Sequence, residues 1–157
     1  MVQAMDTKPS NPRSRVSKPF ERGFRSIGLT GCLLILVLLL AALLRFYGLG
    51  SQSLWNDEGT SVALAQRDLG TIARDAAQDI HPPLYYWLLS GWLRLVGSGE
   101  AALRALSALL GVLLIVLIYA TGRLLVSPPV GLLAAALAAI NPFQVYYSQE
   151  VRMYMLA

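Results

Sequence analysis

The sequence predicts an all-α polytopic membrane protein, and three observations support that fold class. Hydrophobic residues make up 55% of the 157 residues and charged residues only 14%, whereas soluble domains average about 25% charged residues. The mean hydropathy is positive, at +0.54. Three stretches carry no charged side chain: residues 26–44, 105–122 and 124–149. A helix of about 20 apolar residues crosses the hydrocarbon core of a bilayer, so we expect about three transmembrane helices, near residues 27–45, 105–124 and 129–146.

The N-terminal tail predicts the orientation of the first span. Six basic residues precede it: Lys8, Arg13, Arg15, Lys18, Arg22 and Arg25. By the positive-inside rule this excess places the N-terminus in the cytoplasm. We therefore expect residues 1–25 to form a basic, disordered cytoplasmic tail of a protein of the plasma (inner) membrane, with no nucleic-acid partner. A cleaved signal peptide is the alternative, but the apolar run is a full span and Arg45 closes it without a clean cleavage site.

Residues 46–103 are expected to form the first outer loop, with short amphipathic helices beside the membrane. The stretches GTSVALAQRD and LGTIARDAAQD predict two helices that break around Gly70, with Asp68 as a cap. Their apolar residues recur at helical spacing: Val62, Ala65, Leu69, Ile72 and Ala76. Such helices can lie on the membrane surface or pack on the spans.

The stretch HPPLYYWLLSGWLRLV follows in the same loop. Pro82 favours an extended conformation at His81, and Pro83 can open a helix from Leu84. About 13 apolar residues are too few to span a bilayer, which favours an interfacial or re-entrant helix. Four aromatic residues suit the headgroup level: Tyr85, Tyr86, Trp87 and Trp92.

The chain beyond the second span is predicted to return to the outer face. GRLLVSPP joins the second and third spans as a short turn, and Asn141-Pro142 ends or kinks the third. VYYSQEVRMYMLA then runs to the last residue without a helix stop signal. We therefore expect residues 26–157 to be the N-terminal portion of a larger membrane domain, truncated at its C-terminus.

Two adjacent carboxylates, Asp57 and Glu58, are the first candidates for chemistry. One interpretation is structural, because acidic residues favour the positive end of a helix that starts near Gly59. The other is a general base at the lipid–water boundary, where an acceptor hydroxyl meets a lipid-borne donor. The predicted topology puts both acids on the same face as a second polar cluster, residues 146–154.

The second cluster, YYSQEVRMY, suits sugar binding because it joins aromatic rings to hydrogen-bonding side chains. Glu150 and Tyr154 are predicted to share a helical face, with Arg152 pointing elsewhere. The structural alternative is an interfacial aromatic anchor with a surface ion pair. The candidate substrate-binding residues, together with His81, are Tyr147, Gln149, Glu150, Arg152 and Tyr154.

His81 is the only histidine and Cys32 the only cysteine. His81 can be a turn residue, a phosphate contact or a ligand of a divalent metal. Scattered acids around one histidine are a weak metal signal, so a divalent metal stays an open alternative. A single cysteine excludes an intrachain disulfide and a cysteine-based zinc site.

The order of three motifs resembles the GT-C glycosyltransferases: LWNDEG after the first span, HPPLYYWLL before the second and NPFQVYYSQEVRMYML after the third. The resemblance covers residues 27–157. It is to the branch that holds the dolichyl-phosphate-mannose protein mannosyltransferases, the aminoarabinose lipid A transferases and the Rgt-type bacterial mannosyltransferases. It implies a membrane enzyme that moves a mannose-like sugar from a polyprenyl-phosphate carrier to an acceptor hydroxyl on the outer face.

The same resemblance implies roles for individual residues. Asp57 would deprotonate the acceptor hydroxyl, and Glu58 would orient or electrostatically support it. His81 lies near the family position that approaches the donor phosphate. Some relatives need a divalent metal and others do not. The partners implied are the polyprenyl-phosphate sugar donor, a hydroxyl acceptor and membrane lipid.

Two other classes of function remain as alternatives. A transporter or flippase of lipid-linked sugars would need ionisable groups or broken helices at the bilayer midplane, and the charge-free spans speak against it. A non-catalytic membrane subunit would bind the carrier lipid without forming product.

Overall fold

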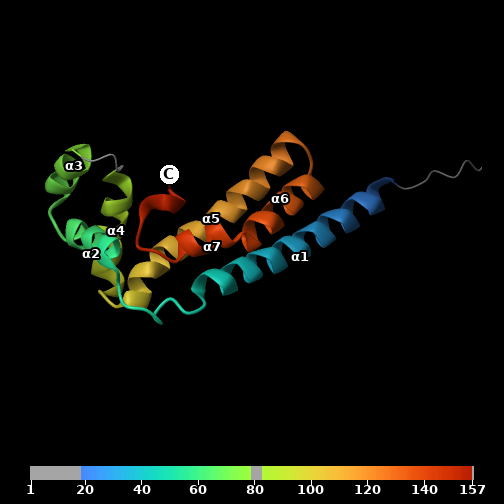
Figure 1. Cartoon of the computed structure of the whole chain (residues 1–157). Helices are drawn as coiled ribbons and strands as arrows, with labels where there is room; N and C mark the ends of the chain where they lie inside the picture. Colours follow the sequence, from blue (N-terminus) through green and yellow to red (C-terminus); the bar gives the residue numbers. More distant parts are fainter. Residues whose placement is uncertain (1–18, 79–82, 157) are drawn as a thin grey trace, which may run out of the picture.

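The computed structural model describes residues 19–78 and 83–156, and every regular element in these ranges is a helix. This confirms the predicted all-α fold (Figure 1). The helices are α1 (Pro19–Phe46), α2 (Asn56–Ala65), α3 (Leu69–Gln78), α4 (Pro83–Val96), α5 (Glu100–Leu125), α6 (Pro128–Ile140) and α7 (Pro142–Ser148), followed by the short 3₁₀ helix η1 (Met153–Met155). Most of the predicted tail, residues 1–18, and the candidate His81 lie outside the described residues.

Helices α1, α5 and α6 lie side by side in one bundle (Figure 1). Two stretches are long and apolar enough to cross a membrane, Gly28–Phe46 and Glu100–Leu125. Helices α6 and α7 together count as a third span, bent by 63° at Asn141. The chain is therefore an integral membrane protein, with two or three spans in its described residues, as the charge-free stretches predict.

The bend between α6 and α7 follows from the Asn141-Pro142 pair that predicted a kink. Asn141 has an extended conformation, and its side chain accepts a hydrogen bond from the backbone N–H of Gln144 at 3.2 Å. Asn141 thus caps the start of α7, and Pro142 occupies the first helical position, where its missing N–H costs least. The same pair that ends α6 therefore starts α7 in a new direction.

The interior of the bundle is made of small side chains that let the helices approach closely. Its buried residues are Ala41, Ile115, Ala135 and Ala139. At the α5–α6 crossing, a Cβ atom on Gly131 would lie 2.6 Å from the carbonyl oxygen of Tyr119 and 2.7 Å from the backbone nitrogen of Arg123. Only glycine fits at this position.

Gly131→Leu is therefore expected to separate α5 from α6 and to destabilise the fold by about 1–3 kcal/mol or more, the usual cost of overpacking. Thermal unfolding in detergent, followed by circular dichroism, measures the change. Gly28→Leu is the matched control, because a Cβ at Gly28 has no atom within 4 Å. Equal destabilisation by both substitutions would contradict the close crossing.

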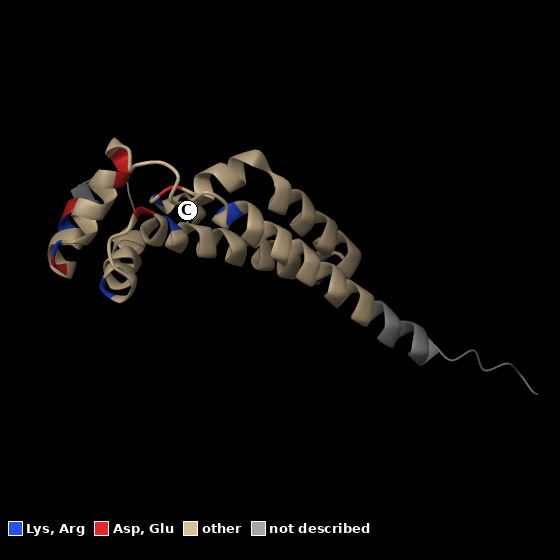
Figure 2. Ribbon diagram, turned by 90° about the horizontal axis from the view of Figure 1, so that it is seen from below, with Lys and Arg blue, Asp and Glu red and all other residues tan. Residues whose placement is uncertain are grey.

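Helices α2, α3 and α4 form a second group at one end of the bundle. Figure 2 shows that most of the charged residues coloured in it gather at this end, while the coloured part of the bundle is almost free of them. A buried core joins this group to α5 and to the chain after α7: Ala65, Ile72, Tyr85, Tyr86, Leu89, Leu103, Leu106, Val151 and Met153. Ile72 places the apolar face of α3 against α4 rather than on the spans.

The predicted break around Gly70 lies slightly earlier in the structure. Helix α2 ends at Ala65 and α3 begins at Leu69, so Gly70 is inside the first turn of α3. Asp68 is the cap that the sequence predicts, since its carboxylate accepts from the N–H of Thr71 at 3.0 Å. The cap, rather than the glycine, sets where α3 begins.

Candidate functional site

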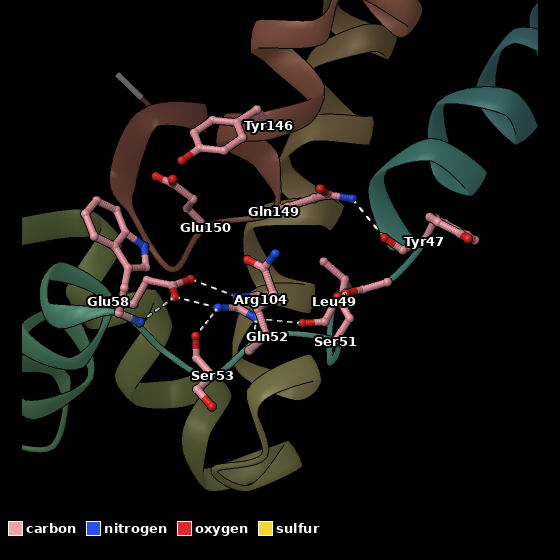
Figure 3. A pocket seen from close by; sticks show the side chains of 12 residues that line it. Tyr47, Leu49, Ser51, Gln52, Ser53, Glu58, Arg104, Tyr146, Gln149 and Glu150 are labelled. Carbon is pink, nitrogen blue, oxygen red and sulfur yellow. Dashed lines mark hydrogen bonds and ion pairs between the residues drawn. The ribbon is translucent and has the colours of Figure 1, made fainter.

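Glu58 lies in the first turn of α2 and is completely buried. Its carboxylate accepts hydrogen bonds from Nε of Arg104 at 2.9 Å and from Nη2 at 2.6 Å. It also accepts from the backbone N–H of Val151 at 3.0 Å and of Trp55 at 3.3 Å. This one carboxylate therefore joins α2, α5 and residues 149–152, the segment that follows α7; Figure 3 shows the pair with Arg104.

Arg104 is the site residue that the sequence pattern does not reveal. Its remaining N–H groups donate to the carbonyl oxygens of Leu49 at 2.8 Å, Gln52 at 2.7 Å and Ser53 at 3.2 Å. With the two bonds to Glu58, these interactions use all five guanidinium donors. One signal could have indicated it: an arginine at the edge of an apolar span needs a polar partner.

Glu58 is held in its ionised form by these contacts. Burial alone would raise its pKa, but the hydrogen bonds from Arg104 and from the Val151 N–H outweigh burial and lower the pKa below the usual 4.5. The stabilisation is complete above the unfolded-state pKa and is lost as the pH falls through the lower folded pKa. At neutral pH Glu58 is therefore an ionised structural carboxylate whose acceptor positions are occupied.

Asp57, its neighbour, has a different environment. Its side chain is 45% exposed, and it forms an ion pair with Arg152, whose Nη2 lies 3.8 Å from Oδ2. The structure thus brings together an acid from α2 and an arginine 95 positions later in the chain. Of the two adjacent carboxylates, Asp57 is the accessible one.

The second cluster is not one continuous helix, because residues 149–152 separate α7 from η1. The prediction that Glu150 and Tyr154 share a helical face is therefore wrong. Helix α7 ends at Ser148, and Arg152 is extended, with φ −140° and ψ 158°. The physical reason is tertiary: the N–H of Val151 bonds to buried Glu58 instead of a carbonyl one helical turn earlier. The prediction that Arg152 points away from this group is also wrong, because its guanidinium lies over the ring of Tyr154 as well as beside Asp57.

Three of the predicted binding residues form an aromatic group with a cation. The rings of Tyr147 and Tyr154 meet edge to face, with centroids 4.7 Å apart. The guanidinium carbon of Arg152 lies 5.7 Å from the centroid of Tyr154, within the range of a cation–π contact. Tyr146 adds a further ring, 5.3 Å from that of Tyr147. Stacking thus holds Arg152 on the side of the segment that faces Asp57.

A cavity of about 440 Å³ opens between the α1–α2 connection and the end of α7 (Figure 3). Its side chains are aromatic, hydroxyl, amide and carboxyl groups, chiefly Tyr47, Gln52, Trp55, Tyr146, Gln149 and Glu150, with Glu58 and Arg104 behind them. Arg104 is the only cation in this lining, and its donors are all engaged. The cavity therefore suits an uncharged ligand rich in hydroxyl groups better than an anion.

Glu150 is an acid in that cavity with little access to solvent. Burial raises its pKa, although a hydrogen bond with Tyr146 lowers it in part. For a raised carboxyl pKa, the stabilisation is complete below the unfolded-state pKa and is lost as the pH rises through the folded value. Glu150 can therefore exchange a proton closer to neutral pH than an exposed glutamate.

Glu150→Gln is expected to increase the free energy of unfolding at pH 7 and to leave it almost unchanged at pH 4, because glutamine mimics the protonated acid. Thermal unfolding of the two proteins in detergent at both pH values measures this. Glu58 has the opposite sign of pKa shift, so Glu58→Gln should destabilise at pH 7. A stability difference between wild type and Glu150→Gln that does not change with pH would contradict the raised pKa.

Gln149 combines two roles in the geometry. It lines the cavity, but its amide nitrogen donates to the carbonyl oxygens of Leu44 and Tyr47, each at 3.0 Å, at the end of α1.

Within the described ranges, no group of three His, Cys, Asp or Glu side chains could hold a metal ion.

Comparison with known families gives one match. Residues 80–155 match the model of the family described as dolichyl-phosphate-mannose-protein mannosyltransferase. The match contains α4 to α7, the 149–152 segment and Arg104, but not Asp57 or Glu58. No curated protein and no solved structure gives a significant match.

The family match confirms the resemblance to the GT-C mannosyltransferases. The apolar helices indicate an integral membrane protein, and residues 80–155 are similar to a family of glycosyltransferases. Since Glu58 is bonded to two residues inside the matched region, Arg104 and Val151, the α2 acids are physically attached to it.

Proposed function

From this family match, we propose that the site transfers a sugar from a polyprenyl-phosphate carrier to an acceptor hydroxyl, with Asp57 as the general base. The observation that carries the proposal is that the two adjacent acids have different environments. Glu58 is buried and saturated with donors, whereas Asp57 is half exposed beside Arg152. A general base must be accessible to the substrate and held in a fixed position. Asp57 is accessible, and the buried Glu58 next to it in the chain holds the start of α2 in place.

The reaction balances with these groups. The acceptor oxygen attacks the anomeric carbon, its proton passes to Asp57, and the bond from that carbon to the phosphate oxygen breaks. The lipid phosphate leaves with the bonding electron pair, and Arg152 is the nearby cation that can stabilise its negative charge. If the reaction follows the family, the configuration at the anomeric carbon inverts.

The cavity supports the same class of substrate. Sugar rings present apolar faces to aromatic side chains and hydroxyl groups to carboxylates and amides, which are the groups that line it. Because its one cation is fully engaged, we place the sugar or the hydroxylated acceptor there and the phosphate toward Arg152. His81 retains its proposed role as a further phosphate contact.

A transport assay and a transfer assay on the same vesicles test the proposal. The full chain is reconstituted in liposomes with a radiolabelled mannosyl-phosphoryl-polyprenol and a panel of hydroxyl acceptors: peptide, lipid and glycan. We expect covalent product from the lipid-linked donor and none from a nucleotide sugar. Saturable donor binding without product on any acceptor would favour the non-catalytic subunit instead.

A transporter is the second candidate, because the bent pair α6–α7 is a broken helix of the kind that transporters use. The bend lies at the end of the bundle that holds the site, beside the end of α1. Labelled sugar that accumulates in the vesicles without covalent transfer would favour this alternative.

A further inference from the structure

The ends of two membrane helices satisfy each other's carbonyl groups. Arg45, in the last turn of α1, is completely buried. Its Nη1 donates to the carbonyl oxygen of Ala139 at 3.0 Å, and its Nη2 donates to that of Ala138 at 3.4 Å, both in the last turn of α6. In the opposite direction, Gln149 donates to the carbonyls at the end of α1.

Arg45 reaches two carbonyls at the α6–α7 bend: Ala138, which also accepts from the backbone N–H of Asn141 at 3.4 Å, and Ala139. In a continuous helix, the N–H groups of residues 142 and 143 would bond to the carbonyls of Ala138 and Ala139. Residue 142 is a proline and has no N–H, and the 63° bend carries the next residue away. The guanidinium thus supplies a donor to Ala139 and a second, longer one to Ala138. Unsatisfied carbonyls in an apolar medium are costly.

The rest of the bundle is shaped around this guanidinium. On α5, a Cβ at Gly111 would lie 2.9 Å from Nε of Arg45 and 2.7 Å from Cβ of Ser148. The space that glycine leaves therefore admits both the arginine and the end of α7. Nε itself has no hydrogen-bond partner, so the charge is balanced chiefly by the negative ends of α1 and α6.

Gln149 makes the contact in the opposite direction, from the end of α7 to the end of α1. It follows α7 directly, and its amide nitrogen bonds to Leu44 and Tyr47 of the α1 end, with a longer contact of 3.4 Å to the carbonyl of Arg45. The next residues are Glu150 in the cavity, Val151 on Glu58 and Arg152 beside Asp57. Any shift of α7 would therefore move the partners of both acids.

We propose that Arg45 and Gln149 are positioning residues: together they form a reciprocal helix cap that fixes α7 and the 149–152 segment against the α2 acids. Neither residue needs to touch the reacting atoms. The structural part of this inference stands by itself, and its effect on catalysis rests on the proposed function.

Cross-linking measures directly whether the 149–152 segment stays close to the start of α2. In a Cys32→Ser background, cysteines at positions 57 and 152 are joined by a short bifunctional thiol reagent in the full chain in liposomes. We expect Arg45→Met and Gln149→Leu each to lower the cross-link yield several-fold, and Arg45→Lys to lower it less, because lysine keeps the charge but not the forked donors. The double variant should lose little more than either single one, since both break the same cap.

Matched controls separate this effect from a general loss of arginine or glutamine. Arg123 is also in the last turn of a spanning helix but is exposed, and Gln66 is an exposed glutamine at the end of α2. Arg123→Met and Gln66→Leu should leave the cross-link yield unchanged.

Transfer assays with Asp57 and Arg152 intact give the second readout. A displacement of about 1 Å can cost about 100-fold in rate, so kcat should fall in Arg45→Met, which lies outside the cavity lining, more than KM for the donor rises. An unchanged cross-link yield in both variants would overturn the proposal. A lowered yield in a protein whose wild type transfers no sugar would retain the cap and reject the proposed function. If Arg45→Met does not insert into membranes, Gln149→Leu decides.

Discussion

Replacement of Asp57 by asparagine is expected to reduce sugar transfer by about 10²–10⁴-fold, the usual contribution of a general base. Asparagine has the same shape but cannot take up the acceptor proton. Among the described residues the Asp57 carboxylate makes one long ion pair, 3.8 Å from Arg152, and it is 45% exposed, so its loss should leave the fold intact. Initial rates with the lipid-linked donor, together with the melting temperature, measure the two effects separately.

The chain offers a matched acid as the control for this substitution. Asp75, on α3, is also partly exposed and also pairs with an arginine, Arg67. Asp75→Asn should leave transfer unchanged, because Asp75 does not line the cavity. Retained turnover in Asp57→Asn would reject Asp57 as the general base. Another residue would then have to take up the acceptor proton.

Arg104→Met should destabilise the protein by about 3–5 kcal/mol, the typical cost of leaving one partner of a buried ion pair alone. Glu58 would remain buried without its cation, and the carbonyls of Leu49, Gln52 and Ser53 would lose their donor. The α1–α2 connection that forms one wall of the cavity would then be released. Unfolding by denaturant in mixed micelles measures the loss.

Two further variants test whether the pair itself is responsible. Arg94→Met, in the last turn of α4, removes an exposed arginine and should change stability little. The double variant Arg104→Met with Glu58→Leu should recover part of the loss, because no uncompensated charge is left in the core. A double variant that is as unstable as Arg104→Met would mean that the carbonyl contacts, and not the ion pair, dominate.

The sequence predicts best those features that depend on local composition. Long apolar stretches require helices in a membrane because every backbone group must be paired internally, and the observed spans follow the charge-free runs. The proline after Asn141 predicts the bend, and Asp68 predicts a helix cap, since each acts on its own few neighbours. The aromatic, polar cluster after the third span supplies part of the cavity lining, and the family match covers that cluster.

Only the tertiary structure decides which of the two adjacent acids is free. Asp57 and Glu58 are equivalent in the sequence, and they differ because Arg104 and the Val151 N–H approach one of them from distant parts of the chain. The same contact ends the helical pattern that predicts a shared face for Glu150 and Tyr154. Likewise, the sequence shows Arg45 only as the residue that ends the first apolar stretch. In the structure it donates hydrogen bonds to carbonyls at the end of α6, more than 90 residues later in the chain. Buried polar groups must find partners wherever the fold brings them, and a local pattern contains no information about where that is.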